Sequence, residues 1–312
     1  MTTPVQTLPR QDGDLETALA AVTAAAGIRD AEPVPEFPEA AIAQLEGAGA
    51  MAFNASMGTQ RPPAAQELNL VRRVAQADGS VGRIFDGHLN AVERLAAQAP
   101  RELAEPELAA VAAGRLRAGV WGGDPASGEG DPAQVVTRTG SLLLRGVKTF
   151  CSGAGGLHRA LILARAPAGG PPVSVWIDLE DHRVTVDRTW YRSHGLRASV
   201  SHRVLFDDVP VLAQLGPAGS IAAQPWFARD ALRTAASWAG MADAAVGGAL
   251  GELAGRQRRG ELESLAAGRI LTAHRTISVW IQAATKAMDD GASDLPAVSV
   301  HGRAAIAEAC RT

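Results

Sequence analysis

The sequence predicts an α+β protein in three parts: an N-terminal helical domain, a central antiparallel β-sandwich or barrel, and a C-terminal helical bundle. Three observations lead to this prediction. Apolar residues recur at helical spacing at both ends of the 312-residue chain, β-rich runs bounded by turn formers fill the middle, and no helical segment separates those runs. We place the domains at residues 1–118, 119–217 and 218–312.

The first domain is expected to be helical because short amphipathic segments alternate with breaks that contain Pro or Gly. Leu15, Leu19 and Val22 recur at helical spacing in the first of these segments. The same pattern repeats in four further segments, near residues 38–48, 64–77, 82–98 and 104–118.

The character of the sequence changes near Trp121, where the stretch GGDPASGEGDP is rich in turn formers and cannot continue a helix. Short runs dense in β-forming residues follow: QVVTR, SLLLRG, RALILAR, PVSVWIDL, RVTVD and HRVLFDDV. Thr139 and Gly140, between the first two runs, are expected to form a tight hairpin turn. Because no helices intervene, the pattern favours an antiparallel sandwich or barrel.

Helical periodicity returns after Pro225. One apolar stripe covers residues 235–253, a second covers 262–288, and a third helix is expected to begin near Val298. Two long helices and a fragment form an incomplete bundle, since a four-helix bundle needs four amphipathic faces. Either a neighbouring chain supplies the missing faces or the chain is truncated.

Composition argues against several classes of protein. The net charge is −3 and no basic block appears, so we expect no nucleic-acid partner. Cys151 and Cys310 are too few for a disulfide framework or a metal site, and we expect reduced thiols in a cytoplasmic protein. The polar N-terminus does not resemble a signal peptide, and no apolar stretch of about 18 residues is present to span a membrane.

Two blocks of the sequence resemble the acyl-CoA dehydrogenase family of flavoproteins. The block KTFCSGAGGLHRALILAR (148–165) is similar to the family segment in which Lys precedes an aromatic residue, a Ser or Thr two positions later, and a small-residue turn into a strand. The block GLRASVSHRVLFDDVPV (195–211) resembles the family's Gly-Leu/Met-Arg-x-Ser run that ends in Phe-Asp/Glu-Asp-Val-x-Val. Weaker matches at 78–89 and 231–260 extend the resemblance over most of the chain.

The resemblance implies an oxidoreductase that binds FAD. A flavin ring needs an aromatic or apolar wall and a few hydrogen-bond donors at its polar edge. We expect Phe150 to supply the wall and Ser152 a hydroxyl, and we include Cys151 between them in the cofactor site. Arg256 falls where the family places an arginine that reaches the flavin pyrophosphate of the neighbouring subunit. The simpler alternatives are a core aromatic for Phe150 and a solvated helix end for Arg256.

The loop WGGDPASGEGD (121–131) lies where the family has a Glu-Pro-Gly-x-Gly-Ser-Asp-like loop. Gly123 stands in place of the family's Thr that touches the pyrimidine edge of the flavin. A side-chain donor is therefore missing, and backbone N–H groups would have to serve instead.

The resemblance also implies a carboxylate base, which removes a proton next to the thioester carbonyl while flavin N5 takes a hydride from the next carbon. Such a base needs a dry pocket that makes it more basic. Most of the family carry it in a loop expected beyond Thr312, but a minority place it on the long helix, where Asp230 is the nearest candidate. The alternative is that Asp230 serves the first turn of that helix.

Four further residues have both a functional and a simpler interpretation. Arg197 and Ser199 resemble a family position that orders the β domain beside the flavin and substrate, but a structural contact of Arg with a carbonyl or an Asp is the default interpretation. His88 and His158 titrate near neutrality and so could act as acid or base. No partner pattern in the sequence supports that role, and a histidine satisfied by its surroundings is the default.

Three functions stay open at this point. The first is an acyl-CoA dehydrogenase that takes an acyl-CoA or similar small molecule and passes electrons to an electron-transfer acceptor. The second is a flavin monooxygenase of the same fold, which uses reduced flavin and oxygen and needs no carboxylate base. The third is a non-catalytic member that lacks the base. The resemblance further implies a homo-oligomer, in which the last helices of neighbouring chains pack together and complete the flavin site.

Overall fold

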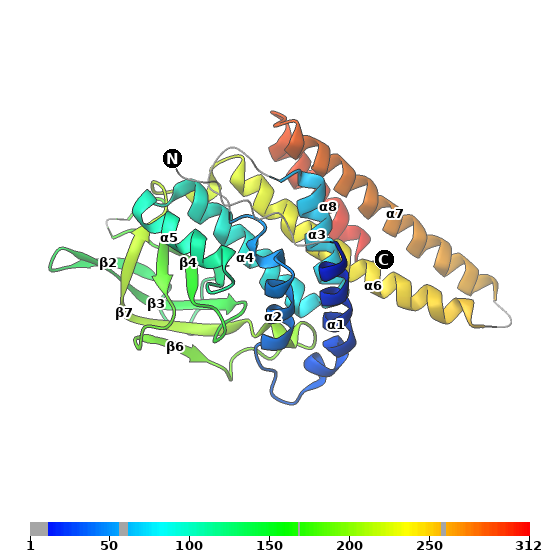
Figure 1. Cartoon of the computed structure of the whole chain (residues 1–312), viewed down its shortest axis with the longest axis horizontal. Coiled ribbons are helices and arrows are strands. Elements are labelled where there is room, and N and C mark those ends of the chain that lie inside the picture. The colour runs from blue at the N-terminus through cyan, green and yellow to red at the C-terminus, as the bar shows by residue number, and fades with distance from the viewer. Residues whose placement is uncertain (1–11, 56–61, 168, 257–259) are drawn as a thin grey trace. The chain divides into compact units, whose positions relative to one another are not determined.

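A computed structural model of the chain confirms the α+β composition (Figure 1). It describes every residue except 1–11, 56–61, 168 and 257–259. The chain divides into two compact units. The first holds residues 1–61 and 83–223, and the second holds residues 62–82 and 224–312.

Helices and a sheet make up the first unit. Its helical elements are α1 (Asp12–Ala31), α2 (Glu39–Gly47), η1 (Ala50–Ala52), α4 (Gly79–Gln98, whose first turn belongs to the second unit), α5 (Arg101–Ala112), η2 (Arg197–Ser199) and η3 (Ser220–Ala222). Leu95 of α4 and Leu108 of α5 join Leu161 and Trp176 of the sheet in one buried apolar cluster. Burial of these faces positions the sheet against the helices.

The strands of the first unit are β1 (Ala118–Trp121), β2 (Gln134–Arg138), β3 (Ser141–Cys151), β4 (Arg159–Ala164), β5 (Val173–Asp178), β6 (Val184–Asp187) and β7 (His202–Gln214). The order is β1-β4-β5-β7-β3-β2, and β6 also pairs with β7. The N-terminal part of β7 pairs with β3 and β6, and its C-terminal part pairs with β5. The long strand β7 therefore joins the two halves of the sheet.

Two details of the predicted sheet are wrong. The sheet is mixed rather than antiparallel, because β1 runs parallel to β4, and it is open rather than a closed barrel, because β1 and β2 end the strand order. The four residues of β1 are too few to show a period, so the sequence assigned their start to a helix. The hairpin prediction is confirmed: Thr139 and Gly140 have positive φ between the paired residues Arg138 and Ser141.

The second unit consists of helices: α3 (Ala64–Ala77), α6 (Trp226–Ala254), α7 (Glu261–Asp289) and α8 (Leu295–Ala309). The helix α3, which the sequence grouped with the N-terminal segments, packs against α6 and α7. Gly240 permits the close approach of α6 to α3, since a Cβ there would lie 1.9 Å from the Arg72 carbonyl oxygen. Within the described parts of the chain, no helix has the length and apolarity of a membrane span.

Candidate functional site

An aromatic side chain projects from the sheet near the end of β3. Phe150 has a φ of +54°, which is an outlier for a bulky residue. The β3–β7 register shifts between Lys148 and Cys151, as in a β-bulge. Phe150 is 63% exposed, whereas Thr149 and Cys151 on either side are buried. The rings of Phe150 and Trp190 form a T-shaped pair with centroids 5.0 Å apart, and most of the Phe150 side chain stays exposed.

Hydrogen bonds join the loop after β1 to Lys148 and Thr149, the two residues of β3 that precede Phe150. Lys148 Nζ donates to Asp124 Oδ1 (2.7 Å) and to the Gly122 carbonyl (3.2 Å). The Thr149 amide and hydroxyl donate to the carbonyls of Gly123 and Asp124, each at 3.0 Å. A Cβ on Gly123 would lie 2.5 Å from the Thr149 carbonyl oxygen. The family's Thr would therefore not fit at position 123, because only glycine allows the backbone of this loop to pair so closely with Thr149.

Beyond Phe150 the chain turns inward. The Cys151 side chain is fully buried, and burial raises the pKa of its thiol well above the usual value, so the thiol stays protonated. Any contact of Cys151 with a ligand at the Phe150 face must therefore come from its backbone. Ser152 is buried too, and its hydroxyl shares a hydrogen bond of 2.9 Å with the Ser201 hydroxyl. The Trp121 indole N–H donates to the Ser152 carbonyl at 3.0 Å.

His202 lies opposite Cys151 in the β3–β7 pairing, and the sequence did not single it out. Burial, with a further contribution from Arg188, lowers the pKa of His202, although Asp187 opposes the shift. Its Nδ1 is buried and has no hydrogen-bond partner among the described residues. Its ring meets that of Tyr191 edge-on at 6.3 Å. The sequence placed His202 in a strand but offered no sign that one ring nitrogen would be left unsatisfied.

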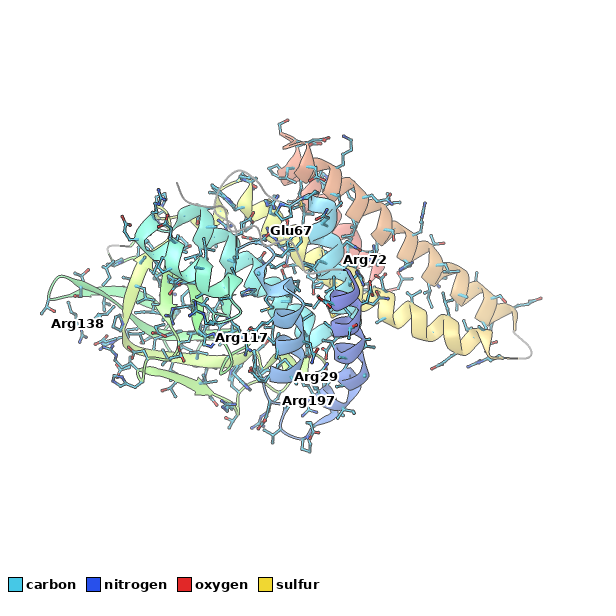
Figure 2. All side chains as sticks on the ribbon, in the orientation of Figure 1. Arg29, Glu67, Arg72, Arg117, Arg138 and Arg197 are labelled. Atoms are coloured by element: carbon cyan, nitrogen blue, oxygen red, sulfur yellow. The ribbon has the colours of Figure 1, made fainter. Side chains whose placement is uncertain are left out.

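Asp230 lies in a charged cluster of the second unit. It is the fifth residue of α6, beyond the first turn of that helix. Arg233 Nη1 donates to Asp230 Oδ1 at 3.4 Å, and Arg233 Nε donates to Glu67 Oε1 at 2.6 Å. Arg229 donates to the other oxygen of Glu67 at 2.8 Å. Figure 2 marks Glu67 on α3. Asp230 therefore lies beside a guanidinium and not in the dry pocket expected of the base.

Arg256 lies just past the C-terminal end of α6 and forms an ion pair with Glu263 in the first turn of α7. Asp230 and Arg256 are separated by almost the whole length of α6, about 39 Å at the rise of an α-helix. The structure thus groups Phe150, Cys151 and Ser152 in the first unit and leaves Asp230 and Arg256 far apart in the second.

Arg197, His88 and His158, which the sequence also singled out, form hydrogen bonds with backbone groups. Arg197, marked in Figure 2, donates to the carbonyls of Asp30 (2.9 Å) and Pro33 (3.1 Å). His88 Nε2 lies 2.8 Å from the Met51 carbonyl and its Nδ1 accepts from the Ala118 amide. Burial lowers the pKa of His88. His158 Nδ1 accepts from the Arg117 amide at 2.9 Å. These contacts support the structural interpretation of each residue.

Comparisons with known proteins bear on the fold. No family model matches the chain, and no curated protein matches it. A structure of KijD3 in complex with dTDP matches at 21% identity over 99% of this chain and 86% of that one, with a TM-score of 0.80. FMN-bound TdsC from Paenibacillus sp. A11-2 matches at 19% identity over 95% and 82%, with a TM-score of 0.78. A steroid ACAD variant matches at 18% identity over 96% and 84%, with a TM-score of 0.72.

One of these neighbours holds FMN, and another is named an ACAD, an acyl-CoA dehydrogenase. The likeness extends over nearly the whole chain and shows that the chain has their fold. It confirms the fold that the resemblance implied.

Proposed function

We propose that this chain binds a flavin against Phe150 and is a flavin-dependent oxidoreductase. The observation that supports this most directly is the exposure of the Phe150 ring at a strained backbone position between two buried residues. An exposed aromatic ring on a rigid strand is the wall that a flat tricyclic ring needs. The FMN in the TdsC structure supports the same class of cofactor.

The residues around Phe150 fit the ring end of a flavin. Phe150 would stack on the ring, and Ser152 would donate a hydrogen bond to its polar edge. Lys148 and Asp124 would hold the Gly122–Gly123 backbone close to it. When bound, the flavin supplies the redox chemistry, by accepting or donating electrons. Arg256, which would reach the pyrophosphate of a neighbouring subunit's flavin, pairs with Glu263 in this chain. FAD was expected from the sequence, and FMN is the alternative.

Of the two possible reactions, the geometry of Asp230 favours oxygenation over dehydrogenation of an acyl-CoA. Asp230 accepts a hydrogen bond from Arg233 and does not lie in the dry pocket that the base needs. Oxygenation with reduced flavin needs no such carboxylate, and another structure of TdsC names that protein a dibenzothiophene monooxygenase. Acyl-CoA dehydrogenation, with Asp230 as base and an electron-transfer acceptor, is the second candidate.

We also propose that the chain forms a homo-oligomer through its C-terminal helices. Large apolar side chains are exposed along α7 and α8: Leu262, Leu265, Leu271, Val279 and Val300. Leu262 is 82% exposed. Leu271 and Val279 border the same hollow on α7, and exposed apolar side chains that gather in one place mark an interaction surface. Light scattering coupled to size-exclusion chromatography should give a multiple of 32.3 kDa; a monomer at micromolar concentration would contradict the proposal.

The cofactor proposal is tested by the absorbance spectrum of the purified protein, before and after incubation with FAD and with FMN. We expect flavin bands that survive gel filtration, and the released flavin identifies the cofactor. Phe150→Ala should weaken flavin binding about ten-fold or more, the scale of about 1–3 kcal/mol for one stacked ring. Leu212→Ala, which removes an exposed apolar side chain elsewhere on the sheet, is the control. A colourless wild-type protein that takes up neither flavin would refute the proposal.

The reaction is tested with the flavin-loaded protein. Rapid bleaching by acyl-CoA without oxygen, abolished in Asp230→Asn, would establish dehydrogenation and contradict our preference. Absence of bleaching, together with oxygen-dependent reoxidation of the reduced flavin coupled to hydroxylation of an added substrate, would support oxygenation.

A further inference from the structure

Three buried serine hydroxyls form a chain that ends beside Phe150. Ser199 Oγ lies 2.8 Å from Ser201 Oγ, and Ser201 Oγ lies 2.9 Å from Ser152 Oγ. Ser199 is fully buried, whereas Ser152 is 8% exposed. The row of hydroxyls therefore runs from Ser199 in η2 to Ser152, two residues after Phe150 at the end of β3.

Unfavourable backbone geometry brings these hydroxyls together. Val200, between Ser199 and Ser201, has a φ of +42°, which is a genuine outlier for a β-branched residue. Phe150 shows the same kind of outlier on the facing strand, two residues before Ser152. The Gly153 amide donates to the Ser199 carbonyl at 2.8 Å and ties the two segments together. Strain of this kind costs about 1–3 kcal/mol per residue and is concentrated at functional sites.

The direction of the hydrogen bonds between the three serine hydroxyls follows from the surroundings of Ser199, the most buried of them. Each serine hydroxyl has one proton to donate. Among the described residues of the protein, Ser199 Oγ has no hydrogen-bond partner other than Ser201 Oγ. If Ser201 donated to Ser199, the proton of Ser199 would point into the interior without an acceptor, which is costly. Ser199 therefore donates to Ser201, and Ser201 donates to Ser152.

We infer that Ser199 and Ser201 are positioning residues that fix the rotor of the Ser152 hydroxyl. Because Ser152 accepts from Ser201, its own proton is free to donate to the ligand held against Phe150. Hydrogen bonds in a chain polarise one another, so the two inner serines also strengthen the outer donor. This inference rests on the proposed flavin site. Its consequence is that Ser152 stabilises the reduced, more negative flavin over the oxidised one.

The direction of the chain can be tested without any flavin, from the unfolding equilibria of three alanine variants. Ser152→Ala leaves the proton of Ser201 without its acceptor, and Ser201→Ala does the same to Ser199. Ser199→Ala removes only a donor and leaves no orphaned proton. We expect the first two to increase the unfolding equilibrium constant about ten-fold more than Ser199→Ala. A larger loss of stability in Ser199→Ala than in Ser152→Ala would reverse the direction and overturn the inference.

The effect on the ligand is tested with flavin-loaded protein, by measuring the dissociation constants of oxidised and reduced flavin or the midpoint potential. We expect Ser201→Ala to lower the preference for reduced flavin about ten-fold, which is about 30 mV for a two-electron couple. Ser152→Ala should lower the preference for reduced flavin further than Ser201→Ala does, and Ser199→Ala should lower it less. Ser201→Thr keeps the hydroxyl and should keep the preference of the wild-type protein.

The matched control is Ser174→Ala. Ser174 lies on β5 in the same unit, is buried, and has a hydroxyl with no partner among the described residues. The Ser174→Ala variant should leave the preference for reduced over oxidised flavin unchanged. If flavin binds and Ser201→Ala behaves like this control, the positioning role is refuted while the flavin proposal stands. If wild-type protein binds no flavin, the proposed function fails as well.

Discussion

The two units each contain a buried polar cluster, and the clusters differ in what they leave unsatisfied. In the helical unit, Glu67 accepts hydrogen bonds from Arg229 and Arg233, and Asp230 accepts one from Arg233, so two negative charges balance two positive ones. In the strand-rich unit, neutral hydroxyls lead through Ser201 to Ser152, beside a strained and exposed Phe150. A cluster that satisfies itself holds helices together. A cluster with one proton left over and strain in its backbone is suited to receive a ligand.

The largest effect should come from the helical cluster. Glu67→Gln removes the carboxylate that compensates two buried guanidinium groups, and breaking a buried pair costs about 3–5 kcal/mol. Urea denaturation of the purified protein measures the change. Glu105→Gln, which breaks the exposed Arg101–Glu105 pair, should change stability by about 0.5 kcal/mol or less. Equal losses in the two variants would mean that the buried cluster is not what stabilises this unit.

Close packing of α3 on α6 gives the next prediction. In Gly240→Ala the new Cβ overlaps the Arg72 carbonyl, and overpacking of this kind costs about 1–3 kcal/mol. Gly247 lies on the same helix, and a Cβ added there would meet no atom within 4 Å, so Gly247→Ala should stabilise the protein by up to about 1 kcal/mol. Thermal unfolding of both variants should therefore shift in opposite directions; a shift in the same direction would contradict the packing argument.

Acid should destabilise the strand-rich unit through its buried histidines. Burial lowers the pKa of His88, and it also lowers that of His202. The unfolded chain then binds more protons than the folded one below the ordinary histidine value of about 6.5. Stability is therefore complete above that pH and falls as the pH drops, by up to about 1.4 kcal/mol per pH unit for each proton. Unfolding midpoints between pH 5 and 8 measure the slope, which should be shallower in His88→Gln. An unchanged slope in that variant would exclude His88 as a cause.

The smallest effect isolates the strain at Phe150. Glycine adopts positive φ without penalty and alanine does not, so Phe150→Gly should be about 1 kcal/mol more stable than Phe150→Ala. Both variants lose the aromatic wall and should bind flavin equally weakly. Chemical denaturation compares the two proteins. Equal stability would mean that the backbone at this position stores no strain.

Local pattern was sufficient for most of the secondary structure. The helices α3, α6 and α7 and the strands β2 to β7 all fall on segments that the sequence marked, because their periodicity and bounding turn formers extend over enough residues. Phe150 and Ser152 were also recognised from the sequence, as part of the block at residues 148–165. The strand β1 was missed because four residues show no period.

By itself, the sequence determined which segments are helices and strands, and that the Phe150 block resembles a flavoprotein. Only the tertiary structure decided that β1 pairs in parallel with β4, that α3 belongs with the C-terminal helices, and that Ser201 and Ser199 stand behind Ser152. The physical reason is that periodicity reports which face of a segment is buried. Which other segment buries it, and which hydroxyl meets which, depends on contacts between residues far apart in the chain.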